Sequence, residues 1–214
     1  VIGAGSGGCP VANRLSTNPK NRVMLLEAGP KDRDIWIHIP IGYYRNMISS
    51  LSWGYKTEPD KEVAHRSILW PRGKVLGGSS AINGLVYIRG QKEDYDHWRQ
   101  LGNEGWGYSD VLPYFRKAEN QERGCDQYHG RGGPIQVSDI RDKRKICDAF
   151  VEAAVQSGIP RNDDFNGAEQ EGVGIFQTTT ENGRRCSSAT GYLKPVRHRP
   201  NLSVETDAMV MKLL

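Results

Sequence analysis

The apolar positions at the start of the chain predict a compact strand–helix–strand unit. Residues 8–16 show a helical pattern, because Val11 and Leu15 lie four positions apart on one face. Residues 22–27 are a short apolar run, typical of a strand that is buried in a parallel sheet. Residues 1–2 read as the stub of an earlier strand, so the whole segment predicts a βαβ unit.

Three further helices are predicted by apolar residues that recur three and four positions apart. They cover residues 93–101, 109–118 and 145–156. Ser109 is expected to be the N-cap of the second helix. In the third helix, Ile146 and Phe150 share an apolar face, and Gly158 is expected to end the helix.

Strands and turns are expected between and after these helices. Strand patterns cover residues 133–138 and 201–206, and Asn182 with Gly183 predicts a hairpin turn. A short helix is expected after Ser188. Residues 29–70 show no regular period and are expected to form a long irregular excursion over the surface.

The first candidate site is a glycine motif at the start of the βαβ unit. Gly3, Gly5 and Gly8 satisfy the G-x-G-x-x-G pattern between a predicted strand and a predicted helix. These glycines permit a tight turn, a close approach of backbone to a pyrophosphate, and close packing of helix on sheet. The N-terminus of the helix offers free N–H groups and its positive dipole end to phosphate. Glu27, at the end of the next strand, is expected to accept hydrogen bonds from ribose hydroxyls. This combination favours a dinucleotide site over a simple glycine-rich turn and disfavours a 2′-phosphorylated cofactor, but it does not separate NAD from FAD.

A second and longer glycine-rich segment spans residues 71–90. Its small side chains indicate that backbone approaches a large, flat ligand over several residues, which a simple nicotinamide-binding domain does not need. Arg72 and Lys74 flank this segment, where each would either neutralise phosphate or form a structural salt bridge.

Residues 73–96 resemble the first signature segment of the glucose–methanol–choline (GMC) family of flavoprotein oxidoreductases. Residues 3–8 and 27–29 resemble the FAD fingerprint of that family. Further similarity lies at residues 95–98, 105–107, 112–115, 129–130, 164–167, 182–185, 192–193 and 201–202. The resemblance covers essentially the whole chain and is strongest to the bacterial choline-dehydrogenase-like alcohol dehydrogenases.

The resemblance implies which residues bind the cofactor. In the family, the counterparts of Ser80 and of residues 83–86 line the flavin and its pyrophosphate, mostly through backbone groups, and the counterpart of Val210 touches the adenine. The complete implied set is Gly3, Gly5, Ser6, Gly7, Gly8, Glu27, Ala28, Leu76, Gly78, Ser80, Asn83, Gly84, Leu85, Val86 and Val210. Some members attach FAD covalently through a His just before the counterpart of Asn83. Ile82 occupies that position here and cannot form the bond, which implies non-covalent FAD.

The implied fold is α/β, with a three-layer Rossmann-type FAD-binding domain and part of an α+β substrate-binding domain. We expect residues 1–120 to form the FAD-binding domain, residues 121–180 part of the substrate-binding domain, and residues 181–214 to return to the FAD-binding domain. Both ends read as cut through secondary structure, so an N-terminal fragment of a longer protein is expected. The family's catalytic His belongs to the part beyond Leu214, and no catalytic residue is expected in the chain itself.

The implied activity is FAD-dependent oxidation of a primary alcohol, with hydride transfer to flavin N5. Three alternatives remain open at this point. A hydroxynitrile lyase of the same family would use the flavin structurally, an NAD-dependent dehydrogenase would lack flavin, and a partial FAD-binding module would be inert by itself. The alcohol, the electron acceptor and the oligomeric state are not readable from these residues.

Composition and charge restrict the partners, the location and the metal binding that we expect. The 214 residues carry a formal net charge of +4, which does not demand nucleic acid or a membrane surface, and no apolar run is long enough for a transmembrane helix. Four separated cysteines indicate reduced thiols in a cytoplasmic protein, although peripheral membrane association stays open, and Cys9 is expected to be a small packing residue. The five histidines show no metal-ligand spacing, so no metal is expected.

Overall fold

A computed structural model describes residues 1–213, and the chain divides into two compact units. Unit 1 comprises Val1–Leu85 and Asn182–Leu214, and unit 2 comprises Val86–Glu181. Residues 86–120 therefore pack with unit 2, although the sequence groups them with the glycine-rich segments. The assignment of FAD-binding and substrate-binding domains stays a prediction.

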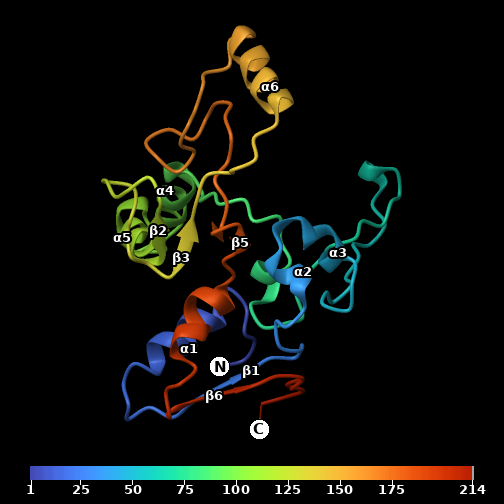
Figure 1. The fold of residues 1–214 in the computed structure, drawn as a ribbon, viewed down its shortest axis with the longest axis vertical. Helices are drawn as coiled ribbons and strands as arrows, with labels where there is room; N and C mark the ends of the chain where they lie inside the picture. Colours follow the sequence, from blue (N-terminus) through green and yellow to red (C-terminus); the bar gives the residue numbers. More distant parts are fainter. Residues whose placement is uncertain (214) are drawn as a thin grey trace. The chain divides into compact units, whose positions relative to one another are not determined.

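Unit 1 is built on a pair of parallel strands with a helix against it. Strand β1 (Val23–Leu26) pairs in parallel with β6 (Leu202–Glu205), with Val23 opposite Leu202. Ile2 forms a parallel bridge to Leu26, and helix α1 (Gly8–Leu15) follows it and packs on β1 (Figure 1). The predicted βαβ unit and the α/β fold class are confirmed.

Burial along β1 differs from the expected pattern. Val23 and Leu25 are buried, but Met24 between them is 54% exposed. Successive side chains of a strand point to opposite faces, so within the described residues only one face of β1 is covered. The expectation of a strand buried on both faces is wrong for this part of the chain.

The rest of unit 1 consists of short elements joined by irregular chain. They are α2 (Ile35–His38), η1 (Pro40–Gly42), α3 (Tyr43–Met47), η2 (Lys61–Val63), η3 (Gly78–Ala81), β5 (Arg184–Arg185), η4 (Ala189–Leu193) and η5 (Lys194–Val196). The excursion over residues 29–70 is thus mostly irregular, as expected, but it contains short helices. One of them, α2, begins where Asp34 Oδ1 accepts a hydrogen bond from the Trp36 N–H at 2.9 Å. A small core of Ile37, Leu51, Val75, Ala81 and Ile82 holds these segments together.

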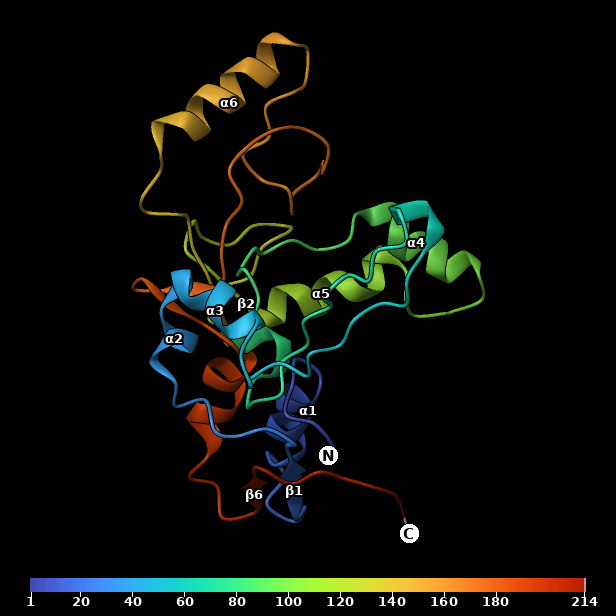
Figure 2. The ribbon, with the colours of Figure 1, turned by 90° about the vertical axis from the view of Figure 1, so that its right-hand side faces the viewer.

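Unit 2 contains three longer helices and two short parallel strands. The helices are α4 (Lys92–Gln100), α5 (Tyr108–Ala118) and α6 (Lys145–Gln156), all close to their predicted bounds. Helices α4 and α5 lie side by side (Figure 2). Strand β2 (Glu119–Gln121) pairs in parallel with β3 (Ile135–Val137), and β4 (Thr180–Glu181) ends the unit. The turn residues that follow, Asn182 and Gly183, have φ of 50° and 74°, the left-handed pair that a tight hairpin turn needs.

Two details of the helices correct the predictions. The N-cap of α5 is Gly107, whose N–H donates to Asp110 Oδ2 at 3.1 Å, and Ser109 lies inside the helix. In α6, Ile146 and Phe150 are 74% and 69% exposed, so the predicted apolar face is largely uncovered by the described residues. Gly158 follows α6 with a φ of +96°, as expected for a residue that ends a helix.

Candidate cofactor site

The first glycine motif forms a tight turn between Ile2 and α1. A Cβ on Gly8 would lie 1.9 Å from the carbonyl oxygen of Gly3, so only glycine fits where the helix meets the turn. The N–H of Gly3 donates to the carbonyl of Leu26 at 2.8 Å, which holds the turn against the end of β1. The predicted strand–glycine–helix arrangement is therefore present.

The second glycine segment lies directly against the first. The N–H of Gly77 donates to the carbonyl of Ala4 at 2.8 Å, and a Cβ on Gly78 would lie only 2.7 Å from the Cα of Gly5. Backbone meets backbone at this point, and side chains are absent on both sides. The two segments thus border one space, as the sequence predicts.

A cavity of about 510 Å³ opens between these segments, a volume within the usual range of small-molecule sites. Its lining includes seven residues of the implied set: Gly3, Gly5, Ser6, Glu27, Ala28, Gly78 and Val210. It also includes Ile2, Leu26, Trp53, Arg72, Gly73, Ser79, Ala208 and Met209. The lining therefore comes from the first 28 residues, the second glycine segment, the chain after β6 and one residue, Trp53, of the irregular excursion.

The other residues of the implied set do not line this cavity. Within unit 1 these are Gly7, Gly8, Leu76, Ser80, Asn83, Gly84 and Leu85, whereas Val86 belongs to unit 2. Ser80 is occupied within the loop, because its Oγ donates to the Gly77 carbonyl at 2.5 Å and accepts from the Ser188 N–H at 2.9 Å. Their contact with a flavin stays a prediction.

Glu27 lies at the end of β1 and is buried although it is acidic. Its Oε2 accepts a hydrogen bond from the N–H of Ala4 at 2.8 Å, and its Oε1 accepts one from the N–H of Gly29 at 2.9 Å. These bonds satisfy a buried carboxylate, which would otherwise be costly to desolvate. Glu27 therefore links the first glycine turn to the segment that follows β1. Its side chain also lines the cavity.

Trp53 and Arg72 line the cavity, and each forms a cation–π pair with a residue outside its lining. The Arg72 guanidinium lies over the Trp70 ring at 5.2 Å and donates to the Pro71 carbonyl. Lys74 Nζ lies 4.9 Å from the centroid of Trp53. Within residues 1–213 neither cation forms a salt bridge, so the structural alternative weighed from the sequence is not realised there.

Cys9, in the first turn of α1, is a packing residue. Its side chain is fully buried, and its thiol donates to the Ala4 carbonyl at 3.1 Å. Burial raises the pKa of the Cys9 thiol to about 11, so the thiolate is disfavoured at neutral pH.

Unit 2 carries a buried cluster of charges that sequence reasoning did not identify. Arg89 pairs with Glu119 at 2.7 Å, and His129 lies between Glu119 at 3.1 Å and Asp164 at 2.9 Å. Hydrogen bonds to Asp164 and Glu119 raise the pKa of His129 to about 9, which keeps the ring protonated at neutral pH. The family resemblance at residues 73–96, 129–130 and 164–167 included Arg89, His129 and Asp164, but it predicted no role for these side chains. The cluster crosslinks β2, the loop before β3 and the segment after α6.

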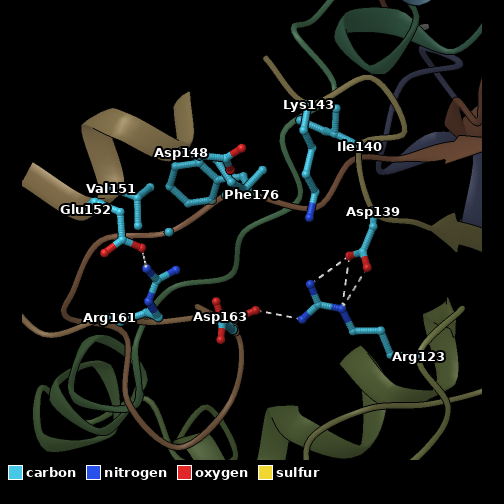
Figure 3. A pocket seen from close by; sticks show the side chains of 12 residues that line it. Arg123, Asp139, Ile140, Lys143, Asp148, Val151, Glu152, Arg161, Asp163 and Phe176 are labelled. Carbon is cyan, nitrogen blue, oxygen red and sulfur yellow. Dashed lines mark hydrogen bonds and ion pairs between the residues drawn. The ribbon is translucent and has the colours of Figure 1, made fainter. Parts of the chain in front are cut away.

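A smaller cavity of about 110 Å³ in unit 2 is lined mainly by charges (Figure 3). Arg161 pairs with Glu152, and Arg123 pairs with Asp139 at 2.7 Å and donates to the Asp163 carbonyl at 2.6 Å. Burial works to raise the pKa of Asp139, but hydrogen bonds from Arg123 and Gln177 hold it below its ordinary value. These pairs link α6 and the segments that follow β2, β3 and α6 around the cavity.

No helix within residues 1–213 is long and apolar enough to cross a membrane. The same residues bring together no group of three or more His, Cys, Asp or Glu side chains that could hold a metal ion.

These features define an α/β protein of the Rossmann type, and comparison with known proteins identifies its family. The family model described as GMC oxidoreductase matches residues 1–214. The chain therefore belongs to the GMC oxidoreductase family.

Relatives and solved structures agree with this assignment. The chain is 47% identical over 216 residues to an alcohol dehydrogenase [acceptor] of Pseudomonas putida, with 100% of this chain and 39% of that protein covered. It is 46% identical over 222 residues to the mitochondrial choline dehydrogenase of Mus musculus, with 100% and 37% covered. The structure matches pyridoxine 4-oxidase from Mesorbium loti with a TM-score of 0.92 and 36% identity over 96% of this chain and 41% of that one. An FAD-dependent oxidoreductase from Chaetomium thermophilum matches with a TM-score of 0.86 and 29% identity over 95% and 37%. The chain thus spans less than half of the length of these proteins.

Proposed function

We propose that this chain is the FAD-binding portion of an oxidoreductase that acts on the CH–OH group of a primary alcohol. The observation that carries the proposal is the direct contact of the two glycine segments, at Gly5 and Gly78, beside one cavity. The family membership supports an oxidoreductase, and a structural neighbour that is FAD-dependent supports the cofactor. We further propose that residues 1–120 and 181–214 serve the FAD and residues 121–180 the substrate.

The cavity suits the half of FAD that carries the pyrophosphate, the ribose and the adenine. The Cβ-free backbone at Gly3 and Gly5 can approach a pyrophosphate, and the N-terminus of α1 offers N–H groups and a positive dipole to it. Arg72 supplies a cation to the same cavity, and Glu27 supplies a carboxylate that can accept from ribose hydroxyls. Val210 lines the cavity on the side of the chain that follows β6, where we place the adenine.

We propose that FAD is held without a covalent bond. Ile82, which precedes Asn83, is buried and has an aliphatic side chain that cannot attack or be attacked by the flavin. The free thiol Cys9 is enclosed and disfavours its thiolate, so it is not a candidate for attachment either. All four cysteines are free, in keeping with the cytoplasmic location that we propose.

Bound FAD would supply the two-electron acceptor for an alcohol that gives up a hydride. The role of the residues in this chain is to bind and orient the cofactor and to neutralise its phosphates. We place no general base among them, and we expect the proton of the alcohol hydroxyl to be taken by a residue outside the chain.

The proposal is tested on the protein purified from cells under native conditions. We expect a yellow protein with flavin absorbance, from which acid or heat releases intact FAD, and bleaching of that absorbance by primary alcohols without oxygen. A colourless protein that binds nicotinamide nucleotides would contradict the proposal. Cyanide release from hydroxynitriles without alcohol-dependent bleaching would instead identify a lyase.

A further inference from the structure

Arg185 is a buried arginine that follows the turn at residues 182–183 and reaches the second glycine segment. Its side chain is 3% exposed. Nε donates to the Ile37 carbonyl at 2.8 Å, and Nη2 donates to the Asn83 carbonyl at 2.8 Å. Nη1 donates to the Ser80 carbonyl at 3.1 Å and to Asn83 Oδ1 at 2.6 Å. The guanidinium thus holds both ends of residues 80–83 against the segment around α2.

The charge of Arg185 has no acidic partner in the described part of the chain. It makes no ion pair among residues 1–213, and burial lowers its pKa to about 10. The other buried arginine, Arg89, pairs with Glu119 at 2.7 Å. Breaking a cluster of hydrogen bonds to a buried charge is costly, so the loop conformation at residues 80–83 is strongly defined.

The contact with Asn83 fixes which way its side-chain amide points. An arginine carries only donors, so the oxygen of the Asn83 amide must be the atom that faces it. The same Oδ1 accepts from the N–H of Leu85 at 3.2 Å, and Leu85 has a φ of 67°, so the amide also stabilises a tight left-handed turn. Asn83 is exposed, and the side-chain hydrogen bonds that its amide forms among residues 1–213 are made through Oδ1. The two N–H groups of the amide are therefore free to donate to a ligand.

We propose that Arg185 is a positioning residue that orients the Asn83 amide so that its NH₂ group donates a hydrogen bond to the isoalloxazine ring of FAD. This proposal rests on the proposed function, because it takes the ligand beside Asn83 to be the flavin. The ring carries acceptor nitrogens and carbonyl oxygens along one side, which match the two donors of an amide. Arg185 does not touch the flavin and acts through Asn83.

The first test compares Arg185→Gln and Arg185→Lys with Arg184→Ala in the purified holoenzyme. Arg184 is the exposed neighbour and serves as the matched control. We expect both Arg185 variants to raise the dissociation constant of FAD on the order of tenfold and to shift the visible absorption bands of the bound flavin. Arg185→Lys should restore little of the FAD affinity or of the wild-type spectrum, since a single ammonium cannot reproduce the planar set of donors of a guanidinium. Arg184→Ala should leave affinity and spectrum unchanged. Arg185 variants that bind FAD with the wild-type spectrum and affinity overturn the proposal.

The second test uses Asn83→Asp, which separates positioning from folding. An aspartate keeps the acceptor for Arg185 but has no N–H to donate. We expect an unchanged or higher Tm together with weaker FAD binding and a shifted flavin spectrum. In a double-mutant cycle, Arg185→Gln should raise the dissociation constant of FAD only slightly when Asn83 is already alanine. The reason is that both substitutions remove the same hydrogen bond from the Asn83 amide to the flavin. Additive effects, or a wild-type flavin spectrum in Asn83→Asp, overturn the inference. A wild-type protein without flavin overturns the proposed function itself.

Discussion

Gly5 and Gly78 meet backbone to backbone, so closely that a Cβ on Gly78 would lie 2.7 Å from the Cα of Gly5. Gly78 also has a φ of +54°, in the left-handed region. Gly78 has no room for a side chain, whereas a Cβ on Gly5 would lie 3.8 Å from the Cα of Gly78, and both residues line the same cavity. The proximity of two distant segments is thus enforced by the absence of side chains at one point.

Gly78→Ala is expected to destabilise the protein and to empty it of cofactor. The left-handed φ and the clash with Gly5 together cost on the order of 3 kcal/mol. The check is a lower Tm together with a lower FAD content per protein. Gly7→Ala is the control for stability, because a Cβ there meets no atom within 4 Å, and the Tm of its FAD-free form should match that of the FAD-free wild type. Equal Tm and FAD content in Gly78→Ala would contradict the contact.

Arg72→Ala is expected to weaken FAD binding without changing the fold. Arg72 lines the cavity and has no salt bridge among residues 1–213, so its charge is available to phosphate. Loss of one charge-assisted contact should raise the dissociation constant on the order of tenfold, and the remaining binding should depend less on salt. Fluorescence titration of apoprotein with FAD measures both effects. Lys61→Ala, at a side chain that is 79% exposed, is the control. Equal affinities of the Arg72 and Lys61 variants would place the phosphate elsewhere.

Stability of the protein is expected to fall in alkaline solution because of His129. The pKa of His129 is raised from 6.5 to about 9 by Asp164 and Glu119, so the folded state binds the proton more tightly than the unfolded state. The stabilisation is complete below pH 6.5 and is lost as the pH rises through about 9. Urea unfolding from about pH 6 to about pH 10 should show a loss on the order of 2–3 kcal/mol. His129→Gln should flatten this dependence, whereas His97→Gln, at an exposed position of α4, should keep it. A flat wild-type profile would show that the cluster does not hold the proton.

Cys9 is expected to resist alkylation in the native protein. Its thiol is buried and its pKa is raised to about 11, whereas Cys125 is exposed. Since the thiolate is the reactive form, iodoacetamide at about pH 8 should label Cys125 first and Cys9 only after unfolding. Peptide mass spectrometry before and after denaturation distinguishes the two. Early labelling of Cys9 would mean that the start of α1 opens readily.

The sequence predicted the elements whose structure depends on residues close together in the chain. The bounds of α6 and the turn at Asn182 and Gly183 follow from periodicity and from residues that tolerate positive φ. The first glycine turn and the position of Glu27 could also be predicted, because a strand–turn–helix–strand unit requires this spacing along the chain.

Features that depend on distant partners, or on a choice between neighbouring capping residues, could not be predicted from the sequence. Ser109 has the chemistry of an N-cap, but Asp110 reaches back to Gly107 and moves the start of α5. Trp53 reaches the cavity from an irregular segment that carries no period. Arg185 lies about a hundred residues from Asn83, and nothing in the local sequence distinguishes it from the exposed Arg184.

The pairing of Val23 with Leu202 has a consequence for synthesis of the protein. A ribosome delivers the glycine turn and β1 before unit 2, but the partner strand emerges only after unit 2 has been translated. Until then the edge of β1 has no neighbour, and Val210 is not yet there to line the cavity. The edge of β1 that pairs with β6 is therefore unpaired while unit 2 is translated, and cofactor loading is expected to follow the synthesis of β6.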